Sequence, residues 1–292
     1  TGLQKLVRSS NSLPRQLKAM EGILPPIKLQ FTRQGKTYPA AEQKQGRVLF
    51  FTGCIQEGFL SSVNQATIRV LQKNGYEVFI PKGQNCCGAA HLHLGDKTGA
   101  QRLARQNIDA FPVQEYDAVI CNAGGCGVSL KEYPALLETD PAYAERAVQF
   151  SRRVKDINEF LFDHLNANPA YPLNVRAVYS DSCHLRHGQK VIKQPRALLK
   201  QIAGLELVEL ASPDRCCGSA GVYNIAQVDT ANAILDAKMD DIAATGAGLI
   251  VTSNTGCQMQ LIAGVRRKGL QARVMHVVEV LDLAYRGDEG RS

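Results

Sequence analysis

The amino-acid sequence predicts an α/β protein with two tandem, pseudo-repeated βα cysteine-rich domains and mainly parallel sheets. Three observations lead to this fold class. Cysteines recur at an offset of 129 to 131 residues, the tripeptide Cys-Cys-Gly occurs once in each half of the 292-residue chain, and short apolar runs alternate with helical patterns. This alternation is typical of βαβ units, in which the strands pair in parallel.

Eight of the nine cysteines form two matching sets of four. In each set a first cysteine is followed by 31 or 32 residues, a Cys-Cys pair, 38 or 39 further residues and a last cysteine. The first set is Cys54, Cys86, Cys87 and Cys126, and the second is Cys183, Cys216, Cys217 and Cys257. Matched spacing of this kind indicates an internal duplication.

The predicted elements follow the same repeat. Strand-like apolar runs lie at 47–54, 76–81 and 116–126 in the first half and at 176–183, 205–210 and 248–257 in the second. Helical patterns lie near 61–73, 97–111 and 127–138, then near 195–203, 229–245 and 258–268, and a last strand and helix are expected within 272–285. Because ligand groups gather at the carboxyl ends of parallel strands, we expect the four thiols of each half to meet at one edge of a sheet.

The turn at each Cys-Cys pair requires a particular backbone conformation. Gly88 and Gly218 follow the two pairs. We expect both glycines to adopt a positive φ, or to lie where a Cβ would face the bound group.

Charge divides the chain into three predicted parts. These are a basic arm at 1–45, a first cysteine-rich domain at 46–166 and a second at 167–292. Residues 1–47 hold nine Lys or Arg and two Glu, so they account for the whole net charge of +7. Such an arm suits an acidic partner subunit, an anionic membrane surface or a solvated linker. Nucleic acid is not expected as a partner, because no nucleic-acid motif accompanies the charge.

The location follows from what the chain lacks. It has no secretory pattern and no apolar run of roughly 18 residues that would predict a membrane-spanning helix. It begins at Thr1, which suggests a piece or processed form of a longer protein. We expect a cytoplasmic protein.

The cysteine pattern favours metal or redox chemistry. Disulfides are not maintained in the cytosol, and packing alone does not explain two matched sets. A four-thiolate zinc site is one alternative, although the usual pair of C-x2-C motifs is absent. An iron–sulfur cluster also takes four thiolates and spreads them over several irons, which suits adjacent cysteines better. Zinc in one of the two repeats stays open.

The remaining candidates are histidines and one cysteine. His91, His93, His184 and His187 each occur in only one half, so hydrogen bonding to ligand sulfurs suits them better than ligation, and a structural role is equally open. Cys121 has no counterpart and is interpreted first as a core thiol and second as a spare ligand. No P-loop, dinucleotide fingerprint or nucleophile elbow occurs, so we expect no catalytic residue in this chain.

Four segments carry a family resemblance: "FFTGCIQEGFLSSVNQATIRVL", "CCGAAHLHLGD", "RCCGSAGVYNI" and "TSNTGCQMQL". They resemble the cysteine-rich, or CCG, domains of heterodisulfide reductase (its B subunit) and related proteins, over about residues 46–285. Within that group the iron–sulfur subunit of glycolate oxidase, also called glycolate dehydrogenase, is most similar. Two departures matter. Relatives often carry a fifth cysteine where Ala123 and Asn254 stand, and they usually begin with a ferredoxin-like domain that is missing here.

The resemblance implies an electron-transfer role. It implies a 4Fe-4S type of cluster, one per repeat, and partner subunits that contain FAD and oxidise glycolate to glyoxylate. Electrons would pass toward a membrane quinone, with the complex peripheral on the cytoplasmic face of the inner membrane. The alternatives are an iron–sulfur subunit of a lactate-oxidation or anaerobic glycerol-3-phosphate dehydrogenase complex, and a zinc-stabilised scaffold without redox activity.

Overall fold

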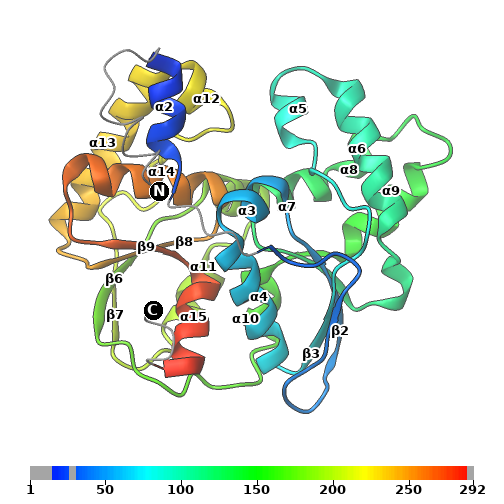
Figure 1. Ribbon diagram of the computed structural model, residues 1–292, viewed down its shortest axis with the longest axis horizontal. Helices are drawn as coiled ribbons and strands as arrows, with labels where there is room; N and C mark the ends of the chain where they lie inside the picture. Colours follow the sequence, from blue (N-terminus) through cyan, green and yellow to red (C-terminus); the bar gives the residue numbers. More distant parts are fainter. Residues whose placement is uncertain (1–14, 26–30, 288–292) are drawn as a thin grey trace.

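The computed structural model describes residues 15–25 and 31–287, which form two β-sheets with helices between and around them (Figure 1). The first sheet has the order β1-β3-β2-β4-β5 and the second β7-β6-β8-β9. The strands are β1 (Thr37–Tyr38), β2 (Gly46–Phe51), β3 (Tyr76–Phe79), β4 (Ala118–Cys121), β5 (Val154–Asp156), β6 (Val175–Tyr179), β7 (Leu205–Val208), β8 (Leu249–Thr252) and β9 (Arg273–His276). All neighbouring pairs are parallel except β1 and β3.

Helices connect these strands. In the first half they are α2 (Arg15–Ile23), α3 (Cys54–Phe59), α4 (Ser61–Lys73), α5 (Ala89–His93), α6 (Lys97–Ala110), the 3-10 helix η1 (Val113–Glu115), α7 (Gly124–Lys131), α8 (Tyr133–Leu136), α9 (Ala144–Arg153) and α10 (Ile157–Asp163). In the second half they are the π-helical turn η2 (His184–Gly188), α11 (Lys193–Leu199), α12 (Tyr223–Ala226), α13 (Val228–Ala244), α14 (Thr255–Lys268) and α15 (Val277–Arg286).

The predicted fold class is confirmed. Without β1, the strand order of the first sheet matches that of the second, because β3-β2-β4-β5 corresponds to β7-β6-β8-β9. The first strand of each half thus has the second strand on one side and the third on the other. This arrangement creates a switch point in each sheet, where the chain leaves in opposite directions and ligands commonly bind.

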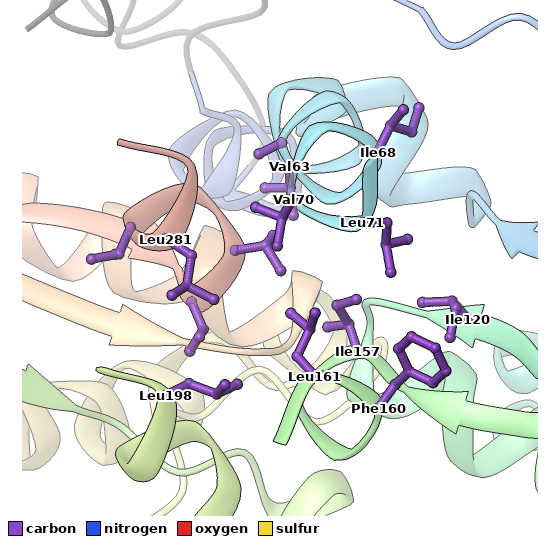
Figure 2. Packing of buried hydrophobic residues seen from close by; sticks show 14 of the residues in the cluster. Val63, Ile68, Val70, Leu71, Ile120, Ile157, Phe160, Leu161, Leu198 and Leu281 are labelled. Atoms are coloured by element: carbon purple, nitrogen blue, oxygen red, sulfur yellow. The ribbon is translucent and has the colours of Figure 1, made fainter. Parts of the chain in front are cut away.

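The two halves share one hydrophobic core through an exchange of helices. Helix α15, which ends the second half, packs against α4 of the first, and α10 of the first half packs against α11 of the second. Figure 2 shows the resulting contacts, with Val70 of α4, Leu161 of α10 and Leu281 of α15 pointing toward one another. All three side chains are fully buried.

The structure corrects three expectations. The helix expected at 127–138 is two helices, α7 and α8, because Pro134 has no N–H to donate and disfavours helical geometry just before it. Strand β5 was not predicted, since Arg152 and Arg153 precede it and the charged Lys155 is its middle residue. Strand β1, which lies within the predicted arm, joins the first sheet.

Part of the predicted basic arm can be placed. Helix α2 packs on α12 and α14 of the second half (Figure 1). The rest of the arm at 1–14 and 26–30 lies outside the described residues. The boundaries of the three predicted parts therefore stay a prediction.

Leu281→Ala tests the shared core. Deleting this buried side chain should lower the free energy of unfolding by about 2–5 kcal/mol. Because the core belongs to both halves, denaturant unfolding followed by circular dichroism should show one transition at a lower midpoint. Leu94→Ala, at a position that is 69% exposed, is the control and should change stability by less than about 0.5 kcal/mol. Two separate transitions, with only one shifted, would contradict a shared core.

Candidate cysteine metal centres

The structure brings each set of four cysteines together as a row of thiols. In the first row Cys54 lies next to Cys86, Cys86 next to Cys87, and Cys87 next to Cys126. The second row repeats this order with Cys183, Cys216, Cys217 and Cys257. The thiols of both rows contact one another in the same sequence, so the duplication extends to their geometry.

Three loops of one sheet assemble each row. Cys54 begins α3 directly after β2, the Cys86–Cys87 pair follows β3, and Cys126 lies in the first turn of α7 after β4. The second row uses the loops after β6, β7 and β8 in the same way. Cys126 and Cys257 were expected to precede helices, whereas they lie inside the first turns of α7 and α14.

Hydrogen bonds along each row make one of the two paired thiols the most acidic. Contacts with Cys54 and Cys87 hold the pKa of Cys86 well below its ordinary value, and contacts with Cys183 and Cys217 do the same for Cys216. The backbone N–H of Gly218 also donates to Cys216 Sγ at 3.3 Å. Contacts along the same rows raise the pKa of Cys54, Cys87, Cys183 and Cys217. Since a thiolate is the form that binds metal, Cys86 and Cys216 are the thiols of the two rows best prepared to act as ligands.

The glycines after the pairs adopt the expected positive φ. The φ angle is 88° at Gly88 and 84° at Gly218, in the left-handed region. A Cβ at either position would face a helix, not the thiols. It would meet Ala100 of α6 at 3.4 Å in the first half and the carbonyl of Ala231 of α13 at 2.4 Å in the second. The second turn is therefore the tighter of the two.

The two rows are joined by short hydrogen bonds between the halves. Asn254 Nδ2 donates to Cys257 Sγ at 3.4 Å, and Asn254 Oδ1 accepts from the backbone N–H of Gly125 at 2.9 Å. Gly125 directly precedes Cys126. The N–H of Gly124 also donates to the carbonyl of Ser253 at 3.2 Å. Asn254 was noted in the sequence only as a departure from relatives, and its role as a bridge required the fold.

The four histidines predicted to hydrogen-bond to ligand sulfurs have different surroundings. His184 is half-buried with Nδ1 3.9 Å from Cys183 Sγ, and burial lowers its pKa. His93, although it follows the first Cys-Cys-Gly, faces His184 of the other half with ring centroids 6.3 Å apart. His91 pairs with Asp96 at 2.8 Å, and its charge contributes to the lowered pKa of Cys86. His187 is exposed. Hydrogen bonding of these histidines to ligand sulfurs stays a prediction.

Cys121 is separate from the first row. It is buried at the end of β4, and its thiol donates to the carbonyl of Ala123 at 3.5 Å. Burial is the main cause of its raised pKa. This geometry matches the interpretation as a core thiol better than that as a spare ligand.

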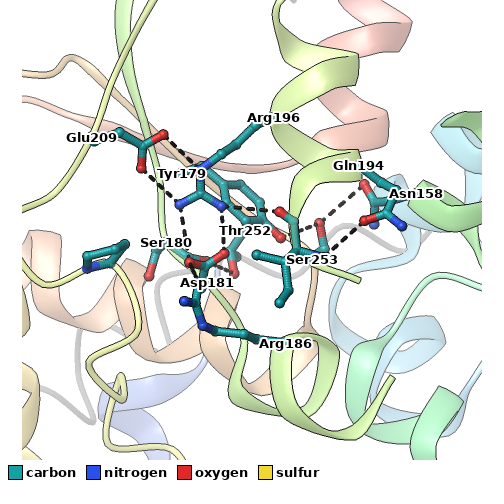
Figure 3. Close-up of polar contacts among 12 residues, drawn as sticks. Asn158, Tyr179, Ser180, Asp181, Arg186, Gln194, Arg196, Glu209, Thr252 and Ser253 are labelled. Carbon is teal, nitrogen blue, oxygen red and sulfur yellow. Dashed lines mark hydrogen bonds and ion pairs between the residues drawn. The ribbon is translucent and has the colours of Figure 1, made fainter. Parts of the chain in front are cut away.

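A charged network holds the loop that precedes Cys183. Arg196 donates to both oxygens of Asp181 at 2.9 and 3.1 Å, and Arg186 donates to Asp181 at 3.0 Å (Figure 3). Arg196 also forms two hydrogen bonds with Glu209 and lies over the ring of Tyr179. Removing Asp181 would leave two cations short of a partner in a partly buried place, which is costly. The network therefore fixes the end of β6.

The donor set fits an iron–sulfur cluster in each half. Four cysteine side chains from three loops are the usual ligands of such clusters. In the described part of the chain, no three or more His, Cys, Asp or Glu side chains are arranged as ligands of one metal ion. Cys54, Cys86, Cys87 and Cys126 would hold the first cluster, and Cys183, Cys216, Cys217 and Cys257 the second.

Comparison with known proteins agrees with this geometry. The model of the cysteine-rich domain, CCG, matches residues 48–131 and 177–262, which include all eight cysteines of the two rows. The chain belongs to the cysteine-rich CCG domain family. The two matched segments coincide with the core of each pseudo-repeat, so the predicted tandem of CCG domains is confirmed.

Relatives of this CCG protein are named as iron–sulfur, reductase or lactate-utilization proteins. It is 42% identical to the probable glycolate oxidase iron-sulfur subunit of Bacillus subtilis, over 96% of this chain and 65% of that protein. It is 34% identical to the B subunit of fumarate reductase (CoM/CoB) of Methanothermobacter marburgensis, over 83% of this chain and 47% of that protein. Lactate utilization protein A of Bacillus subtilis is 30% identical over 81% of this chain and 99% of its own length. The chain thus spans about half to two thirds of the first two relatives, and the predicted resemblance is confirmed.

The fold is also found among solved structures. A hypothetical protein from Helicobacter pylori aligns with a TM-score of 0.60 at 11% identity, covering 97% of this chain and 56% of that one. Its likeness supports the fold alone. Within residues 15–25 and 31–287, no helix has the length and apolar character that crossing a membrane requires.

Gly218→Ala and Gly88→Ala should affect the CCG sites unequally. Both place a Cβ at positive φ, which costs about 1–2 kcal/mol. Only Gly218→Ala also forces a contact of 2.4 Å with a helix carbonyl. We expect Gly218→Ala to lose most of the iron of the second site and Gly88→Ala to retain more of the first. Iron and sulfide content of each anaerobically purified variant measures this, with far-UV circular dichroism as the folding control. Full loading of both variants would show that the turns tolerate a side chain.

Proposed function

We propose that this chain is the electron-transfer iron–sulfur part of a flavin-dependent glycolate dehydrogenase. The observation that carries the proposal is the pair of matching four-thiol rows, each built on the switch point of its own sheet. The names of the relatives, with a glycolate oxidase iron-sulfur subunit among them, support the same role. The clusters supply one-electron redox chemistry when bound, and the protein supplies ligands, burial and a fixed separation.

The two rows are proposed to work in series, because hydrogen bonds connect them. One hydrogen-bonded residue, Asn254, connects the residue before Cys126 with Cys257 itself. Cys54 is the exposed thiol of the set, whereas Cys217 and Cys257 are buried. We propose that a partner that delivers electrons approaches the first site, where Cys54 is exposed.

The proposed partners are FAD-containing subunits, which would oxidise glycolate to glyoxylate, and a membrane quinone as acceptor. The complex would be cytoplasmic and attached to the membrane through its partners. The basic arm is proposed to dock on an acidic partner subunit. The second candidate substrate is lactate, favoured by the lactate utilization proteins that match over 99% of their own length. Reconstitution with each candidate flavin partner, followed by reduction with glycolate or lactate, separates the two substrates.

Cys87→Ser and Cys217→Ser test the redox proposal directly. The unmodified protein, purified without oxygen, should be brown, contain iron and sulfide for two clusters and bleach with dithionite. Each variant should lose about half of the iron, because each removes one ligand of a four-thiolate site. Cys121→Ser is the matched control and should retain all of it, since Cys121 lies outside the rows. A colourless protein with stoichiometric zinc would support a zinc-stabilised scaffold and refute electron transfer.

A further inference from the structure

The two thiol sites differ in charge at one equivalent position. Gly88 packs on Ala100 of α6, and Gly218 packs on Ala231 of α13, so these two alanines correspond. Seven residues further along each helix stand Asn107 and Lys238. Both side chains are fully buried beside the Cys-Cys-Gly loop of their own half. The first site thus has a neutral amide where the second has a cation.

Asn107 has the partners that a buried amide needs. Its Nδ2 donates to the carbonyl of Cys86 at 3.0 Å and to Tyr133, and its Oδ1 accepts from the N–H of Asn85 at 2.8 Å. These bonds hold the first loop. They add no net charge to it.

Lys238 has hydrogen bonds but no ion pair. Its Nζ donates to the carbonyls of Ser212 at 3.2 Å and Pro213 at 3.0 Å, in the loop before Cys216. Among the described residues, none forms a salt bridge with it. The nearby carboxylate of Asp241 accepts instead from the N–H groups of Ala211 and Ser212. A buried ammonium group without a paired anion is expensive unless another negative charge lies close by.

The thiolates of the second row add to the negative charge around Lys238. Burial lowers the pKa of Lys238, whereas the charges of Asp241, Asp181, Cys217 and Cys257 oppose that effect, in this order. Asp181 is paired with Arg186 and Arg196, and Arg196 also pairs with Glu209. Lys238 therefore places a cation that forms no salt bridge among the described residues beside the loop of the second row.

A second pair of equivalent residues also differs in charge, and again the residue of the first half is the more negative one. Asp156 ends β5 opposite Cys121, and His276 ends β9 opposite Thr252, so the two occupy equivalent places in the sheets. Burial raises the pKa of the fully buried Asp156 to about 6 and lowers that of the fully buried His276 to about 4. Lys131, a cation of the first half, is paired with Glu159 at 2.9 Å. At neutral pH the first sheet thus has a carboxylate where the second has a neutral imidazole.

From these differences between the two sites we infer that the positive charge of Lys238 makes the second site the electron acceptor of the pair. This inference rests on the proposed electron-transfer function. Reduction adds one negative charge, which a buried cation stabilises and a buried carboxylate opposes. With clusters bound, the first site would take one electron from a reduced flavin partner and pass it to the second, which would be reduced as the first is reoxidised. The deeper burial of the second row disfavours added charge, and Lys238 offsets that effect.

Lys238→Gln in the full chain tests this inference. Glutamine keeps a donor for the loop carbonyls and removes the charge. A redox titration monitored by EPR, repeated in a Cys87→Ser background that retains only the second cluster, should show the midpoint potential of the second site falling by about 59 mV, or tenfold in the one-electron equilibrium. The potential of the first site should stay unchanged. Lys238→Arg should keep the original potential because it keeps the charge.

The control is Lys268→Gln on α14. It removes a cation of the second half that is partly exposed and paired with Asp240, so it should shift neither potential. A loaded Lys238→Gln protein with an unchanged potential would overturn the inference while leaving the electron-transfer function intact. Loss of the second cluster in both the Gln and Arg variants would also overturn it, because the lysine would then act only as an anchor for the loop. Absence of any cluster from the unmodified protein would refute the proposed function itself.

Discussion

Each row of thiols is assembled from three loops that lie far apart in the sequence, and the parallel sheet beneath them is what brings these loops to one place. β2 lies between β3 and β4, and β6 lies between β7 and β8, so all three carboxyl ends meet at a switch point. The central strands are buried on both faces, as residues 48–51 of β2 show by their zero exposure. The positions of the sulfurs therefore depend on core packing in which Cys87 itself takes part, beside Leu49 and Phe51.

The same packing makes the two sites one unit. Helix exchange buries α4 against α15 and α10 against α11, so neither half completes its core alone. The contacts of Gly124 and Gly125 with Ser253 and Asn254 form across this arrangement. A fixed separation between the two thiol rows follows from these hydrophobic contacts, because a packed interior resists small displacements.

Much of this organisation could be predicted from the sequence, and the limits have physical causes. Matched cysteine spacing predicted both rows because ligands at strand ends recur with the repeat. Strand β5 was missed because its three residues, Val154–Asp156, are too few to show an alternating apolar pattern. The two arginines that precede it also suggested a solvent-exposed segment. The contact of His93 with His184 and the burial of Lys238 depend on tertiary structure, since neither residue lies near its partner in the sequence. The match between Lys238 and Asn107 becomes visible only when the two helices are aligned on their glycine turns.

Asn254 stands where the family resemblance led us to expect a fifth cysteine, and the structure shows what this amide contacts instead. At this position a cysteine would add another thiolate next to Cys257, whereas the amide donates to that sulfur and accepts from the other half. Hydrogen bonds to ligand sulfurs are one of the means by which proteins adjust cluster chemistry. The equivalent Ala123 offers only its backbone carbonyl, which accepts from Cys121. The duplicated halves therefore keep the same four ligands while the residue three places before the last ligand differs. That difference gives the second site a direct connection to the first that a perfectly repeated sequence would lack.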